Sequence, residues 1–253
     1  MGETIEVAGV SDEEQRQIDA AVAAIARGGG ETVRGLALVG EAVPPRRHRG
    51  AARIHLVALV AHAHVATLTN LGRDLPASVA LSVFSAAELT RAADVFALEL
   101  AEQRSRHVTL RGRIPYDQLP ITARLLRLAI ERALRVEVQA LRSALWSGPE
   151  PLLGQLRRAV ERLATVAHQL PPVLGAPGPE SVEADEAALL RDLFGRADAD
   201  GAWVGRWGAY RQTGSLEGPV RLAGEILHGL DAVVALVDGF GAPPGMAPGP
   251  GDA

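Results

Sequence analysis

The chain has 253 residues, of which 47% are apolar and only 4% aromatic, and its formal net charge at pH 7 is −4. The absence of cysteine excludes disulfides, cysteine-based zinc sites and a cysteine nucleophile. All 26 basic residues are arginine, but the negative net charge argues against a protein devoted wholly to nucleic acid.

Two features of the sequence argue against secretion and against a membrane span. The first ten residues carry Glu3 and Glu6 where a secretory signal would carry basic residues and then an apolar run. The most apolar segment, residues 54–68, is shorter than the ~20 residues that a bilayer needs, and it contains three histidines. We therefore expect a cytoplasmic protein with no membrane association.

The amino-terminal third reads as three helices. Ser11 followed by Glu14 has the spacing of a capping box, which predicts a helix that ends at the three glycines from Gly28. A second helix is expected over residues 31–43. Residues 54–68 are apolar on every side apart from three histidines and one threonine, so a helix there has no solvent face. We expect a buried central helix over residues 54–71.

The remaining chain also favours helices. Ser85 and Glu88 form a second capping box, and apolar residues recur at intervals of three and four over 121–146, 152–170 and 216–240. The alternating residues from 107 to 118 read as an extended connector or a short strand, with the connector favoured. We predict an all-α fold, a bundle of seven or eight helices around the central helix.

Composition divides the predicted bundle into parts. The main bundle is expected over residues 1–170, a Pro/Gly linker over 171–179, a carboxy-terminal helical segment over 180–240 and a disordered tail over 241–253. Whether residues 180–240 form a separate domain is left open by the sequence.

Histidines supply the first candidate site. His55 and His62 are seven residues apart and would share one face of the central helix, whereas His64 would point elsewhere. Glu225 and His228 add a Glu-x-x-His spacing of the kind that carboxylate-bridged metal bundles use. These five residues are the candidate ligands of a metal or haem, and neutral, hydrogen-bonded core histidines are the alternative.

An arginine-to-histidine spacing supplies the second candidate. Arg49 precedes His55 by six positions, and similar pairs occur at Arg162/His168 and Arg221/His228. The spacing resembles the Arg-x(4–6)-His motif of HEPN-type ribonucleases, which are helical bundles. The resemblance implies that the arginine and the histidine would act on the phosphate of RNA. The polar residue that usually follows the arginine is missing from all three pairs. Arg49 and His55 are the catalytic candidates on this hypothesis.

Two surfaces are candidates for binding. One is a row of arginines within residues 121–146, namely Arg124, Arg127, Arg135 and Arg142. Acidic residues lie between these arginines and favour the alternative, a solvated face of ion pairs. The other is a concentration of aromatics in a chain that has few, and consists of Trp203, Trp207 and Tyr210. The alternative for these aromatics is that they close one end of the bundle.

Together these patterns predict a non-catalytic helical interaction or regulatory protein that acts through its surface on a protein partner or as a homodimer. No cofactor is expected on this reading, and nucleic acid is a possible but less favoured partner. The alternatives are a metal- or haem-binding bundle and an RNase that uses Arg49 and His55.

Overall fold

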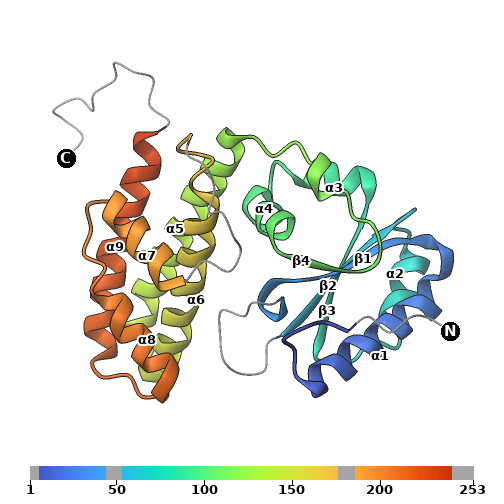
Figure 1. Cartoon of the computed structure of the whole chain (residues 1–253), viewed down its shortest axis with the longest axis horizontal. Helices are drawn as coiled ribbons and strands as arrows, with labels where there is room; N and C mark the ends of the chain where they lie inside the picture. Colours follow the sequence, from blue (N-terminus) through green and yellow to red (C-terminus); the bar gives the residue numbers. More distant parts are fainter. Residues whose placement is uncertain (1–5, 44–52, 176–185, 241–253) are drawn as a thin grey trace. The chain divides into compact units, whose positions relative to one another are not determined.

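The computed structural model describes residues 6–43, 53–175 and 186–240, and the chain forms two compact units, Met1–Ile121 and Thr122–Ala253. Figure 1 shows a sheet with helices in the first unit and helices alone in the second. The boundary falls between Ile121 and Thr122 rather than in the Pro/Gly segment 171–179, of which residues 176–179 lie outside the described residues. The predicted tail, 241–253, also lies outside them.

The first unit is built on a four-stranded mixed sheet with the order β3-β2-β1-β4. Its strands are β1 (Val33–Val39), β2 (Ile54–Val60), β3 (Val79–Ser85) and β4 (His107–Gly112). β2 and β3 are parallel, whereas β1 runs antiparallel to both β2 and β4. The prediction of an all-α fold was therefore wrong.

Helices cover both faces of this sheet (Figure 1). On one face α1 (Asp12–Gly29) and α2 (Val65–Gly72) share a core with alternate strand residues such as Leu38 and Leu56. On the other face α3 (Ala86–Ala92), α4 (Ala97–Ser105) and the short 3-10 helix η3 (Tyr116–Gln118) pack on Val39 and Val57. A strand that is buried on both faces has no need of polar residues at alternate positions.

This double burial explains why the central helix was wrongly predicted. Residues 54–60 are buried at every position except His55 because core lies above and below β2. A short, continuous apolar run fits a buried strand as well as a buried helix, because it shows neither the two-residue period of a strand nor the 3.6-residue period of a helix. The predicted helix over 54–71 is thus β2, a turn and α2. The predicted helix over 31–43 is likewise β1 between the two 3-10 helices η1 (Gly30–Thr32) and η2 (Gly40–Ala42).

The second unit is helical. Its helices are α5 (Ala123–Ala144), α6 (Pro149–Gln169), α7 (Glu186–Arg196), α8 (Trp203–Thr213) and α9 (Pro219–Gly239). The helices predicted over 121–146, 152–170 and 216–240 are confirmed as α5, α6 and α9. None of the helices in the described part of the chain combines the length and the hydropathy needed to cross a membrane.

Candidate functional site

Three strands bring two histidines to the same edge of the sheet. Val39, the last residue of β1, pairs with His55 near the start of β2 and with His107 at the start of β4. Paired residues share a face, and the two histidine backbones lie two strand spacings apart, which is about 10 Å. We call this place the His55 edge; it comprises Arg53, His55, Ser82, His107 and Tyr116.

His55 is held by a serine from the neighbouring parallel strand. Its Nε2 lies 2.8 Å from the Oγ of Ser82, which is 27 residues away along the chain. The ring is partly buried, and burial together with the positive charge of Arg53 lowers the pKa of His55 below 6.5. A lowered pKa keeps the imidazole neutral near pH 7, the form that can accept a proton from a reacting group.

His107 and Tyr116 extend the edge toward β4. The Nδ1 of His107 lies 2.8 Å from the carbonyl oxygen of Gln103, and because a carbonyl only accepts, this nitrogen carries the proton. The ring lies 4.9 Å from that of Tyr116 between centroids. The Tyr116 hydroxyl is buried, has no hydrogen-bond partner among the described residues, and its pKa is raised by burial.

Two arginines fix the backbone around this edge. Arg104 donates to the carbonyl oxygens of Tyr116 and Leu119, at 3.0 and 2.9 Å, and so holds η3 in place. Arg106 donates from Nη2 to the carbonyl of Val43 at 2.7 Å, which ties the segment after β1 to the start of β4. All three bonds are charge-assisted, a class that stabilises more than a neutral hydrogen bond.

The proposed metal ligands are not brought together. His62 and His64 are exposed and stack with their ring centroids 5.6 Å apart. They follow the far end of β2, about 20 Å from His55 at 3.3 Å per residue. Glu225 and His228 lie on α9, where Glu225 pairs with Arg206 and Arg221. Among the residues that the structure describes, no group of three or more His, Cys, Asp or Glu could hold a metal ion.

The ribonuclease motif also finds no support in the geometry. Arg49 lies outside the described residues, and His55 is on a strand of a mixed sheet rather than on a helix of a bundle. A helical-bundle RNase site was therefore the wrong interpretation of this histidine.

Most of the arginine row on α5 is engaged in ion pairs. Arg127 and Arg135 lie 3.6 and 2.9 Å from opposite oxygens of Glu131. Arg135 also reaches Asp238 at 2.9 Å, and Arg142 reaches Asp231 at 3.4 Å, which ties α5 to α9. Arg124 is exposed near the start of the helix.

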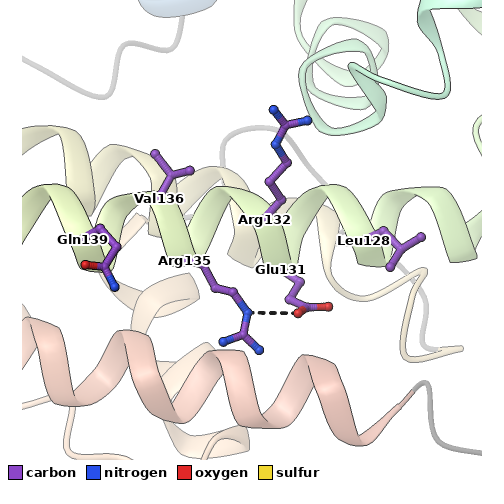
Figure 2. A pocket seen from close by; sticks show the side chains of 6 residues that line it. All are labelled: Leu128, Glu131, Arg132, Arg135, Val136 and Gln139. Carbon is purple, nitrogen blue, oxygen red and sulfur yellow. Dashed lines mark hydrogen bonds and ion pairs between the residues drawn. The ribbon is translucent and has the colours of Figure 1, made fainter.

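A pocket of about 550 Å³ lies along α5 and includes the Glu131–Arg135 pair. Figure 2 shows its lining residues: Leu128, Glu131, Arg132, Arg135, Val136 and Gln139. The Glu131–Arg135 pair lies on one side, while Arg132 extends away from it between two apolar side chains, Leu128 and Val136. An arginine between apolar groups suits a small ligand with one polar or anionic group.

The aromatic cluster belongs to the core of the second unit. Trp203, Trp207 and Tyr210 are buried on α8, and Phe194 of α7 meets Trp203 edge-on with centroids 5.3 Å apart. The binding surface predicted from these three residues is therefore not at the surface. In a chain with few aromatics, α8 supplies the large side chains that fill the space beside α7 and α9.

Sequence reasoning missed Arg53, Ser82, His107 and Tyr116. The sequence signal for Ser82 was the set of short apolar runs 33–39, 54–60 and 79–85, each as long as an ordinary strand, whereas His107 opens the alternating segment 107–118. Interpreted as strands, these runs would have placed His55 at the start of one of them.

Comparison with known proteins finds similarity among solved structures. No family model matches the chain, and no curated protein does. Among solved structures, the chain is similar to spectinomycin adenyltransferase AAD(9) from Enterococcus faecialis, solved with ATP and spectinomycin. The TM-score is 0.53 at 10% sequence identity, over 88% of this chain and 98% of that one.

This similarity extends across both units, so the two proteins share a fold of a mixed sheet with helices followed by a helical unit. The shared fold overturns the expectation of an all-α bundle, and with it the interpretation as a non-catalytic regulatory protein, which was built on that bundle.

Proposed function

We propose that this chain is a nucleotidyltransferase-like enzyme that moves a nucleotidyl group from a nucleoside triphosphate to a hydroxyl of a small polar acceptor. The observation that carries the proposal is the similarity to an adenyltransferase over nearly the whole of both chains. A cytoplasmic location, where nucleoside triphosphates are available, is part of this proposal.

The reaction places clear demands on the protein. The acceptor oxygen forms a bond to the α-phosphorus, the bond from that phosphorus to the bridging oxygen breaks, and pyrophosphate leaves. The acceptor proton must go to a base, and the phosphate charge must be neutralised. We assign both tasks to the His55 edge, because His55 and Ser82 lie on paired strands and Arg53 directly precedes one of them.

His55 is the best candidate for the base. Burial and Arg53 keep the ring neutral near pH 7, and Ser82 fixes its orientation through a 2.8 Å hydrogen bond. Arg53 is exposed, and a guanidinium is suited to bidentate contact with phosphate oxygens.

Phosphoryl and nucleotidyl transfer generally relies on Mg²⁺ held by carboxylates. The His55 edge does not fit such an ion: its side chains are two histidines, a serine, a tyrosine and an arginine. The described residues contain no metal-binding group elsewhere either. We therefore derive no step through a metal.

The test is nucleotidyl transfer by the purified full chain. Each of the four common nucleoside triphosphates is offered with spectinomycin and a panel of aminocyclitols and sugars; pyrophosphate release and the product mass are measured. We expect His55→Gln, which keeps an amide for Ser82 but cannot take a proton, to lower turnover about 10²–10⁴-fold. His62→Gln is the matched control, because His62 is an exposed histidine at the other end of β2.

Two results would count against this proposal. If the wild-type chain transfers no nucleotidyl group to any acceptor, the activity is wrong. If His55→Gln and His62→Gln are equally active, the chemistry does not take place at the His55 edge.

A further inference from the structure

The His55 edge has the charge of an anion site. Arg53 and His55 are two positions apart at the start of β2, and side chains two positions apart in an extended chain leave the backbone on the same side. Arg53 is exposed and forms no ion pair with any residue that the structure describes. Its guanidinium is thus available to a ligand.

Hydrogen-bond donors converge beside that charge. The Ser82 hydroxyl and the His55 imidazole already contact each other at 2.8 Å across β2 and β3. When the His55 Nε2–H donates to the Ser82 Oγ, the Ser82 hydroxyl is left to donate to a phosphate oxygen and the His55 Nδ1 keeps its lone pair. The Ser82 hydroxyl and the Arg53 guanidinium are then the donors at the start of β2.

Two acids of the first unit, Glu88 and Asp117, are engaged in other contacts. Glu88 caps α3 through Ser85, at the far end of β3 from this edge. Asp117 follows Tyr116 in η3, and its carboxylate pairs with Arg113 at 2.8 Å. Nothing in the described residues provides the cluster of oxygen ligands that Mg²⁺ requires.

We propose that the His55 edge binds the phosphates of a nucleotide without a divalent cation, with Arg53 and the His55–Ser82 pair supplying the charge and the donors. This inference rests on the proposed function, because it concerns the nucleotide of the same reaction. Arginine neutralises phosphate charge through fixed, bidentate hydrogen bonds, whereas a metal needs carboxylates that the edge does not present.

The experiment measures ATP binding to the full chain by calorimetry, once with excess EDTA and once with Mg²⁺. Inorganic tripolyphosphate is a second probe, because it carries the phosphates without the base. We expect both probes to bind in EDTA, with an ATP affinity within about threefold of that in Mg²⁺. Loss of a charged hydrogen bond should make Arg53→Ala bind ATP in EDTA at least about tenfold more weakly.

Arg73→Ala is the matched control, since Arg73 is also exposed in the first unit and bonds only to Asn70 among the described residues. It should bind ATP like the wild type. Ser82→Ala gives a second test within the edge and should weaken binding several-fold with the fold retained by circular dichroism.

The possible outcomes separate the two proposals. ATP binding that requires Mg²⁺ overturns the metal-free site and leaves the proposed function standing. Binding in EDTA that Arg53→Ala does not weaken also overturns this inference, because the phosphates are then held elsewhere. Absence of ATP binding under both conditions overturns the inference and the proposed function together.

Discussion

The packing of α7 against α9 leaves no room for a side chain at Gly229. A Cβ placed there would lie 2.7 Å from Cζ and 2.9 Å from Cδ1 of Phe194, and closer still to Cε1. Phe194 is fully buried, and its ring rests edge-on against Trp203. The ring therefore cannot swing aside without disturbing the core of the second unit.

The expected change in the free energy of unfolding for Gly229→Ala follows from two opposing effects. Alanine favours a helix interior over glycine by about 1 kcal/mol. Overpacking a well-filled core costs about 1–3 kcal/mol, and a fully buried ring pinned by a second aromatic belongs toward the upper end. We expect a net loss of about 1–2 kcal/mol in the free energy of unfolding.

Gly224 provides the matched control on the same helix. It is exposed, and nothing lies within 4 Å of the Cβ that alanine would add. Gly224→Ala should therefore stabilise by up to about 1 kcal/mol, so the two variants should change stability in opposite directions and differ by about 1–3 kcal/mol.

Tryptophan fluorescence during urea unfolding is the assay. The three tryptophans of the chain, Trp146, Trp203 and Trp207, all lie in the second unit, so their fluorescence follows that unit. A Gly229→Ala variant as stable as Gly224→Ala would refute the reasoning, because it would mean that the α7–α9 contact is loose.

Three further predictions concern stability. Ser85→Ala removes the side chain that caps α3 and should cost about 1 kcal/mol in chemical unfolding followed by circular dichroism; an unchanged midpoint would show that the cap contributes nothing. Gly28→Ala should destabilise the first unit in the same assay, because its Cβ would lie 2.8 Å from the carbonyl carbon of Asn70; a stabilised variant would contradict that close approach. Burial raises the pKa of Glu137, which accepts a 2.6 Å hydrogen bond from Gln155, so the native state binds more protons than the unfolded state above pH 4.5. The free energy of unfolding of the wild type, compared with that of Glu137→Gln, should then fall as pH rises from 4.5 to 7. A rise over that range would show that the pKa of Glu137 is not raised.

Local sequence patterns predicted part of this protein correctly. The capping boxes at Ser11 and Ser85 both form, since a cap depends on residues three positions apart. The long helices α5 and α6 were also predicted, because each buries one stripe and exposes the opposite face. The apolar residues of such a helix recur every 3.6 residues, so the helix can be predicted without knowing which element it packs against.

The sheet could not be predicted in this way. β2 is buried on both faces, so its sequence lacks the alternation that identifies a strand, and its apolar run was interpreted as a helix. Its neighbours β1 and β3 come from distant parts of the sequence, and only their pairing satisfies the backbone of β2. Tertiary structure therefore decided the fold class.

The candidate site depends on the same long-range pairing. The sequence by itself singled out His55 as an unusual residue in an apolar segment. It could not indicate Ser82 or His107, because these residues reach the edge only when β3 and β4 join the sheet. It also grouped His55 with His62 and His64 on a helix, whereas the rise of an extended strand separates them by about 20 Å. The sequence alone identified His55 as a candidate, whereas strand pairing decided which residues surround it. Hydrogen bonds between strands join segments that no local pattern connects.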